Sequence, residues 1–135
     1  MSASQAANDS SPEVQTVIAW HDALNSGDVE RLLALSHPDV EVGGPRGSAH
    51  GARILREWVD QADIRLDPGR TFNEAGTVVV EQGAEWQSAD PGNVQTVASV
   101  FVVGDGLVTS VVRYPDLASA LRAANLGTAH EESPG

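Results

Sequence analysis

Four histidines are the side chains best suited to acid–base chemistry near neutral pH, because an unperturbed imidazole titrates there. They are His21, His37, His50 and His130. His21 lies in an apolar helical pattern and His50 precedes a predicted helix, so each is a candidate pocket base or a polar residue at an element's edge. His37 precedes a Pro-Asp pair, where a turn or cap hydrogen bond is expected. Their spacing matches no metal-binding motif.

Other catalytic signatures are missing from the sequence. No nucleophile-elbow pattern occurs, and the Gly/Pro loop at residues 43–47 has neither dinucleotide-fold nor P-loop spacing. The chain has no cysteine, which excludes a disulfide scaffold and a thiolate metal site. We therefore expect neither a metal ion nor a nucleotide, and no cofactor is predicted.

Three helices are predicted in the first half of the chain. Ser11 and Pro12 open the first one as N-cap and first helical residue. It runs to about Asn25 with Trp20 at the edge of an apolar stripe made of Val14, Val17, Ile18, His21 and Leu24. The second helix follows Asp28 and stops at Pro38, with Leu32, Leu33 and Leu35 on its buried side. The third starts after Gly51 with a core face of Ile54, Leu55, Trp58, Val59 and Ala62.

Strand patterns dominate the second half. A short strand at Val40 and Val42 is followed, beyond the third helix, by strands at residues 71–74, 77–88, 94–103 and 107–114. Another at residues 64–66 is interrupted by Asp67-Pro68-Gly69, as a bulge or a turn. Short connections make neighbouring strands antiparallel, and residues 115–125 form a closing helix.

The order of elements predicts an α+β fold in one domain. Helices come first and an antiparallel sheet follows, so a sheet of this length must curl around the helices and leave a pocket in the remaining volume. The domain covers residues 12–126, with flexible tails at residues 1–11 and 127–135.

The composition excludes several partners. The formal charge is −11 and all eight basic residues are arginine, so the acidic surface repels nucleic acid and anionic membranes. No apolar run is long enough to span a bilayer, and the first residues lack the pattern of a signal peptide. A cytoplasmic protein is expected, and the use of arginine without lysine suggests a bacterium with GC-rich codons.

Residues 20–58, WHDALNSGDVERLLALSHPDVEVGGPRGSAHGARILREW, carry a resemblance to a known family. The order of helix, Ser-Gly-Asp break, short helix, strand, Gly/Pro loop and helix resembles the SnoaL-like and ketosteroid-isomerase-like branch of the nuclear transport factor 2-like superfamily. That resemblance implies a cone-shaped pocket in which one curved antiparallel sheet wraps around three or four helices. It also implies a homodimer formed through the sheet, whose outer face would carry Val79, Val97 or Val112.

The resemblance also implies where a ketosteroid isomerase would hold its catalytic groups. The tyrosine position falls on Trp20, the general-base position on Gly44 and the second acid on Ser99. An indole is a weaker donor than a phenol and glycine carries no proton, so this catalytic set is missing. A limonene-epoxide-hydrolase-like set of two aspartates around an arginine is not found either.

The same alignment places Trp58, Phe101 and Val111 against the cavity, and we expect six residues there in all. They are Trp20, Trp58, Ser99, Phe101, Val111 and Arg113. The apolar members could be plain core, since core and pocket wall overlap in a cone. Arg113 shares its strand parity with Leu107, Thr109 and Val111, so an inward guanidinium would need a carboxylate or an oxygen-bearing ligand. The alternative is a solvated arginine at the rim.

The parity of the strand at residues 77–88 decides whether the pocket contains an acid. The apolar pattern turns Val78, Val80, Gln82, Ala84 and Trp86 inward, which we favour. A one-residue slip would turn Glu81 and Glu85 inward instead, where either could pair with Arg113 or act as a general base.

Three functions remain open. The first is binding of a small, mostly apolar ligand oriented by Arg113, and a dry cavity containing only Arg113 and Ser99 as polar groups would favour it. The second is a cofactor-free isomerase, cyclase or hydrolase acting on a polyketide-, terpene- or steroid-like substrate, which requires an acid or imidazole in the cavity. The third is a non-catalytic dimeric interaction module, which a filled cavity would favour.

Overall fold

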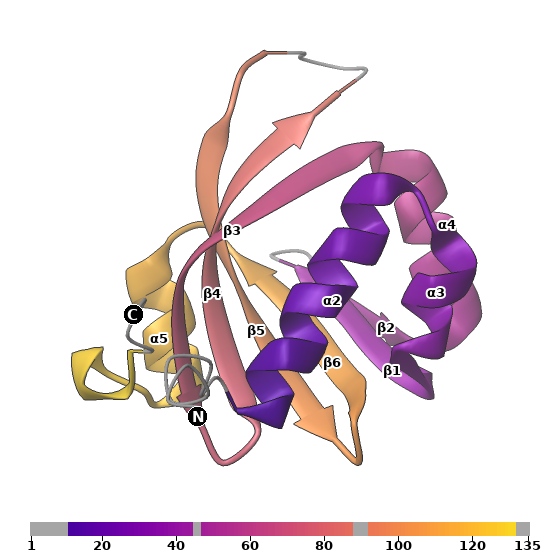
Figure 1. Cartoon of the computed structure of the whole chain (residues 1–135). Coiled ribbons are helices and arrows are strands. Elements are labelled where there is room, and N and C mark those ends of the chain that lie inside the picture. Colours follow the sequence, from indigo (N-terminus) through magenta and orange to yellow (C-terminus); the bar gives the residue numbers. More distant parts are fainter. Residues whose placement is uncertain (1–10, 45–46, 88–91, 132–135) are drawn as a thin grey trace, which may run out of the picture.

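The computed structural model describes residues 11–44, 47–87 and 92–131 (Figure 1). Their elements follow the order expected for an α+β domain. In chain order they are α2 (Pro12–Ser26), α3 (Val29–Ala34), β1 (Ser36–Gly44), β2 (Gly47–His50), α4 (Ala52–Ala62), β3 (Ile64–Glu74), β4 (Thr77–Trp86), β5 (Gln95–Gly104), β6 (Leu107–Tyr114), α5 (Leu117–Ala124) and the 3₁₀ helix η1 (Thr128–His130).

The six strands form one curved sheet in the order β2-β1-β6-β5-β4-β3. All neighbours are antiparallel except β1 and β6, which run parallel. Helices α2, α3 and α4 lie together on one side of the sheet, and α5 lies on the opposite side (Figure 1). The predicted cone of a mostly antiparallel sheet wrapped around helices is therefore confirmed.

Helix α2 begins and ends at the residues that its sequence predicts. The Ser11 hydroxyl accepts a hydrogen bond from the Val14 N–H, and Gly27 closes the helix in a left-handed conformation. Two details of the predicted stripe are wrong. Ile18 is 43% exposed, whereas Trp20, expected at the edge, is fully buried. The buried face is thus centred on Val17, Trp20 and Leu24, which follow each other at 3-and-4 spacing.

Residues 43, 44 and 47 of the predicted Gly/Pro loop belong to paired strands where we expected irregular structure, and residues 45–46 lie outside the described part of the chain. Strands β1 and β2 pair from Glu41 with His50 to Gly44 with Gly47. A Cβ atom on Gly43 would lie 2.7 Å from the Cβ of Ser48, so the close approach of the two strands requires glycine at position 43. Pro38 does not end the preceding helix, since α3 already ends at Ala34 and Pro38 lies inside β1. The strand tolerates this proline because the pairing of β1 with β6 is interrupted between Ser36 and Glu41.

Strand β3 is continuous and contains the bulge that was one of two predictions for this segment. Its register with β4 shifts between Pro68 and Thr71. On β4 the favoured parity holds, since Val78, Val80 and Ala84 are buried in the main core on the helix side. Glu81 and Glu85 share the parity of Val79, which packs on the opposite side of the sheet.

The predicted parity of β6 is wrong in its first half. Its register with β5 shifts between Val102 and Val103, which leaves Thr109 without a cross-strand partner. Val108 is therefore the buried residue there, and neither Leu107 nor Thr109 is. After this bulge Val111 and Arg113 pair with Phe101 and Ser99, so the inward parity expected at the end of the strand is kept.

Helix α5 covers part of the outer face of the sheet. Phe72, Val79 and Ala98 form a second core cluster with Ala120 of this helix. Val97 belongs to the main core on the inner face. Val79 and Val97 thus give no reason for a partner to cover the sheet, and the homodimer stays a prediction. Residues 127–131 are not a frayed tail, because η1 is followed by a bridge from Glu131 to Phe72.

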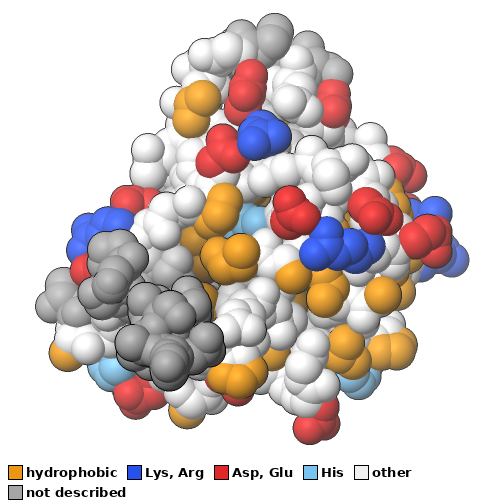
Figure 2. All heavy atoms as spheres, viewed as in Figure 1, with side chains coloured by type: hydrophobic (Ala, Val, Ile, Leu, Met, Phe, Trp, Pro, Cys, Tyr) orange, Lys and Arg blue, Asp and Glu red, His pale blue; other side chains and the backbone are white. Residues whose placement is uncertain are grey.

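The described surface mixes both signs of charge. Figure 2 shows acidic side chains spread over one face with basic side chains beside several of them. Five arginines form exposed ion pairs with carboxylates, namely Arg31, Arg53, Arg56, Arg65 and Arg70. Such pairs contribute little to stability because water screens them. In the described part of the chain, no helix is long and apolar enough to cross a membrane.

Two neighbouring residues of α2 test the position of its buried face. Val17→Ala should lower the free energy of unfolding by about 2 kcal/mol, because it opens a cavity in the core. Ile18→Ala should change it by less than about 0.5 kcal/mol, because that side chain is largely solvated. Denaturant unfolding of both variants measures the difference, and equal losses would show that the helix is rotated relative to this description.

Candidate functional site

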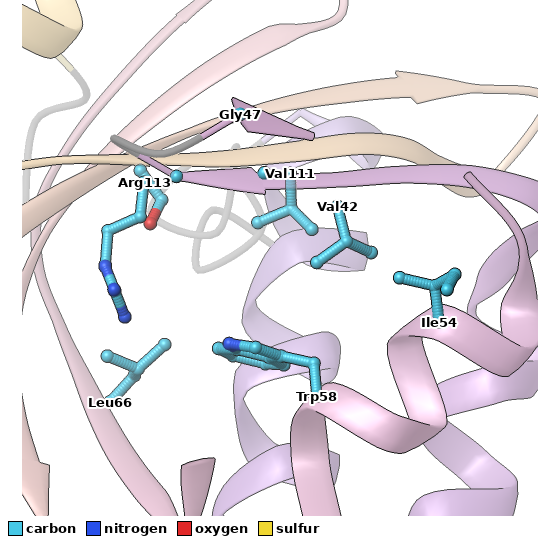
Figure 3. A pocket seen from close by; sticks show the side chains of 10 residues that line it. Val42, Gly47, Ile54, Trp58, Leu66, Val111 and Arg113 are labelled. Carbon is cyan, nitrogen blue, oxygen red and sulfur yellow. The ribbon is translucent and has the colours of Figure 1, made fainter. Parts of the chain in front are cut away.

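A partly enclosed pocket of about 490 Å³ lies between the concave face of the sheet and helix α4. Its wall combines apolar side chains, three glycines and two polar side chains. The lining residues are Val42, Gly43, Gly44, Gly47, Ile54, Trp58, Leu66, Ser99, Val111 and Arg113. Figure 3 shows the Arg113 guanidinium entering the space bounded by Leu66, Trp58 and Val111. The volume is in the range of small-molecule sites.

An aromatic cluster supports the helix side of the pocket. Trp58 from α4 stacks on Trp20 with ring centroids 6.5 Å apart, and Trp20 meets Phe101 edge to face at 5.2 Å. Trp20 and Phe101 are fully buried and lie outside the pocket lining. Of the six residues expected against the cavity, Trp58, Ser99, Val111 and Arg113 therefore line it, whereas Trp20 and Phe101 support the wall from behind.

Arg113 is the charged side chain among the described residues that line this pocket. Its guanidinium lies 5.5 Å from the centre of the Trp86 ring, in a cation–π contact. Among the described residues it has no carboxylate within ion-pair distance, in contrast to the five surface arginines. Burial lowers the pKa of Arg113 below its ordinary value, because desolvation disfavours the charged form. The guanidinium still carries its charge at neutral pH, because an arginine titrates far above that range. It faces the cavity (Figure 3), and none of its hydrogen-bond donors is bound to a described residue.

Ser99 connects the pocket to a buried polar chain. Its hydroxyl donates to Gln82 Oε1 at 2.8 Å, and Gln82 Nε2 lies 2.8 Å from His21 Nε2. His21 Nδ1 in turn lies 2.8 Å from the carbonyl oxygen of Val17. All three side chains are at most 1% exposed. The chain satisfies every one of them without water, as burial of polar groups requires.

His21 is a weakly basic, buried imidazole outside the pocket lining and is therefore not available as a pocket base. Burial lowers its pKa from 6.5 to about 4, and the hydrogen bond to Val17 and the charge of Asp67 only partly oppose this. Its Nε2 lone pair is already used by the amide of Gln82. The alternative considered from the sequence, a polar residue at a helix edge, is also wrong, because the ring is buried against Trp20 and Phe101.

The remaining histidines do not line the cavity. His37 Nδ1 accepts a hydrogen bond from the Asp39 N–H, which is the turn contact expected from the sequence. His50 is exposed on β2, and His130 lies 2.8 Å from a carboxylate oxygen of Glu74. Within the described ranges, no group of three histidine or acidic side chains could hold a metal ion.

The three positions that a ketosteroid isomerase would use carry other groups here. The indole N–H of Trp20 donates to the Ser36 hydroxyl at 3.1 Å, behind the wall. Gly44 and Ser99 do line the pocket, but glycine has no side chain and the Ser99 proton is donated to Gln82. No carboxylate or imidazole belongs to the described lining of the pocket.

Sequence reasoning missed Gln82 as part of the site and missed several wall residues. Gln82 was placed on the inward apolar face of β4 but given no role. A lone amide among valines and alanines on an inward face was the available signal, because such a group needs a buried partner. Leu66 and Val42 also line the pocket, because each lies on the inward-facing side of its strand.

Comparison with known proteins identifies relatives by family and by fold. The family model of the SnoaL-like domain matches residues 17–111. No curated protein matches the sequence significantly.

Several solved structures share the fold at low sequence identity. An NTF2-like protein of unknown function from Cytophaga hutchinsonii has a TM-score of 0.68 and 16% identity, covering 84% of this chain and 94% of that one. TerC, co-crystallized with polyporic acid, has a TM-score of 0.71 and 21% identity, with 81% and 95% covered. A candidate polyketide cyclase from Xanthomonas campestris has a TM-score of 0.66 and 23% identity, covering 80% of this chain and 93% of that one.

The neutral state of His21 predicts how stability depends on pH. The pKa of His21 is lower in the folded chain than the usual value of 6.5. As the pH falls, the imidazole is therefore protonated in the unfolded chain before it is protonated in the folded one. This difference in pKa contributes about 3 kcal/mol to the free energy of unfolding above pH 6.5, and the contribution is lost as the pH falls towards 4. Urea unfolding of the wild type between these pH values should show this loss.

Variants separate the histidine from the other titrating groups. His21→Leu should show a markedly shallower pH dependence over the same interval, although its stability at neutral pH is lower. His37→Gln, at an exposed position, should retain the slope of the wild type. An unchanged slope in His21→Leu would contradict a buried neutral imidazole.

Proposed function

Because the chain belongs to the SnoaL-like domain family, we propose that its pocket binds a small, mostly apolar molecule that carries a carbonyl or acidic oxygen. The apolar walls bury the body of the ligand, and Arg113 orients its oxygen. The observation that carries this proposal is the half-buried Arg113 guanidinium, which faces the cavity without a carboxylate among the described residues.

The electrostatics of the pocket favour an oxygen-bearing ligand. A guanidinium offers a planar set of donors, and these bonds are stronger where water is scarce. The Trp86 ring holds the cation from one side without using those donors. A ligand oxygen in the cavity would accept hydrogen bonds from the Arg113 guanidinium, whose donors have no acceptor among the described residues.

A cofactor-free enzyme is the second candidate. What favours it is the fold shared with proteins named as candidate polyketide cyclase and ketosteroid isomerase. Arg113 could stabilise an enolate oxygen in such a reaction. The described lining contains no carboxylate or imidazole to move a proton, however, so the contents of the pocket support binding better than turnover.

The interaction module is the least supported of the three functions. A domain that fills its own cavity would leave no pocket, whereas this one retains about 490 Å³. The polar side chains in the described lining of this pocket are Arg113 and Ser99, which is the arrangement that favours ligand binding.

Tryptophan fluorescence can test the proposal, because Trp58 lines the pocket and Trp86 contacts Arg113. Titration with acetophenone and benzoate should quench emission saturably for at least one of them. Arg113→Met should weaken that binding by roughly 10- to 100-fold, since it removes a charge-assisted hydrogen bond while keeping a long side chain.

Two further variants give the experiment its controls. Arg113→Lys keeps the charge but loses the planar fork of donors, so an intermediate affinity is expected. Arg53→Met removes an exposed arginine from α4 next to the pocket residue Ile54 and should bind like the wild type. Equal affinities in Arg113→Met and the wild type would rule out the proposed role of Arg113.

A further inference from the structure

The polar chain behind the pocket has a fixed direction of hydrogen bonding, which begins at His21. Its Nδ1 lies 2.8 Å from the Val17 carbonyl oxygen, and a carbonyl oxygen can only accept. Nδ1 must therefore carry the proton. Because the buried ring is neutral, Nε2 has none and must accept.

The tautomer of His21 then fixes the amide of Gln82. A hydrogen-bond acceptor at His21 Nε2 requires that the Gln82 NH₂ group faces it, at 2.8 Å. The opposite orientation would place Gln82 Oε1 against an unprotonated nitrogen, so that two acceptors would meet in a buried site. Gln82 Oε1 consequently points to Ser99.

The orientation of Gln82 in turn fixes the hydroxyl of Ser99. Its one proton is donated to Gln82 Oε1 at 2.8 Å, so the lone pairs of Ser99 Oγ are what remains for the pocket. A serine is usually able to donate or accept by rotation of its hydroxyl. Here the buried chain removes that choice and makes Ser99 an acceptor.

Arg113 stands beside this acceptor as a pure donor. Ser99 and Arg113 are direct cross-strand partners on β5 and β6, and both line the pocket. Side chains of such partners start about 5 Å apart on one face of a sheet. The wall thus carries a donor and an acceptor at paired positions of neighbouring strands.

We propose that this Ser99–Arg113 pair makes the pocket selective for ligands in which a hydroxyl donor stands next to a carbonyl acceptor, as in a hydroxy-ketone or an enolised dicarbonyl. The carbonyl oxygen accepts from Arg113, and the ligand hydroxyl donates to Ser99 Oγ. This inference rests on the proposed function and specifies the ligand class of the same site.

The same geometry selects against two related classes of ligand. An ether or ester oxygen in place of the hydroxyl brings an acceptor against the lone pairs of Ser99, with no proton between them. A carboxylate meets the same repulsion through its second oxygen, although its charge still attracts Arg113. Sites built to pair with a ligand hydroxyl discriminate strongly against analogues that lack it. Here the repulsion between two facing acceptors adds to that discrimination.

Three neutral ligands of similar size test the selectivity. They are 2-hydroxyacetophenone, 2-methoxyacetophenone, in which the hydroxyl is methylated, and acetophenone, which keeps the carbonyl but has no second oxygen. Calorimetric or fluorescence titration of the wild type should give the tightest binding for the hydroxy-ketone, by about tenfold or more over the methoxy-ketone. The methoxy-ketone should also bind no better than acetophenone.

Two variants test the origin of that selectivity. Ser99→Ala removes the acceptor, so the preference for the hydroxyl should fall below about threefold. Gln82→Leu releases the Ser99 proton, which can then be donated to an ether oxygen. Binding of the methoxy-ketone should therefore improve more in Gln82→Leu than in Ser99→Ala. Both variants remove the repulsion between two acceptors, but only Gln82→Leu adds a donor for the ether oxygen.

The outcomes separate this inference from the function on which it rests. Equal binding of the three ligands, with the Arg113→Met loss retained, would overturn the hydroxyl selectivity and leave the binding function intact. No binding that depends on Arg113 would overturn both. Cooperative unfolding of each variant confirms that it is folded, and Ser99→Ala carries the test if Gln82→Leu is not.

Discussion

A half-buried guanidinium with no carboxylate beside it among the described residues is the constraint on which the candidate site depends. Transfer of a charge out of water is costly unless it is paired, and proteins usually provide the partner themselves. Around Arg113 the described chain provides a tryptophan ring and an open cavity. The wall on the opposite side is apolar, from Trp58 and Ile54 of α4. This contrast makes a ligand oxygen the natural partner and explains why a small apolar pocket contains a permanent charge.

The curved sheet makes this arrangement possible, and the buried polar chain gives it a chemical direction. Bulges on β3 and β6 interrupt the regular ladders, and the one on β6 sets the parity that turns Val111 and Arg113 inward. Behind the wall, a main-chain carbonyl of α2 determines the tautomer of His21, and His21 determines the orientation of Gln82 and Ser99. A fixed backbone group thus decides whether a side chain in the pocket donates or accepts. The SnoaL-like fold supplies the cone, while these particular side chains specify what it can hold.

Most of the fold was predictable from the sequence, because it depends on local signals. Capping residues such as Ser11 and Gly27 mark the ends of α2, and alternating valines mark the strands. The errors arose where non-local pairing overrides local pattern. Hairpin β1–β2 forms from a glycine-rich segment that reads as a loop, and the bulge at Thr109 exchanges which residues of β6 are buried. In the site, Arg113 was predictable from its strand parity with Val111, and Ser99 from the resemblance to the family. The role of Gln82 was not, because it depends on His21, which is 61 residues away in the chain.

The most direct measurement of the central claim is the nuclear magnetic resonance signal of the Arg113 side chain during a ligand titration. Arginine labelled with ¹⁵N reports each Nε–H group separately, and Arg113→Lys assigns the signal by its loss. We expect 2-hydroxyacetophenone to shift the Arg113 signal saturably, while the signals of exposed arginines such as Arg53 and Arg56 stay in place. Saturable binding that leaves the Arg113 signal unchanged would show that the ligand is held elsewhere, and it would contradict the account.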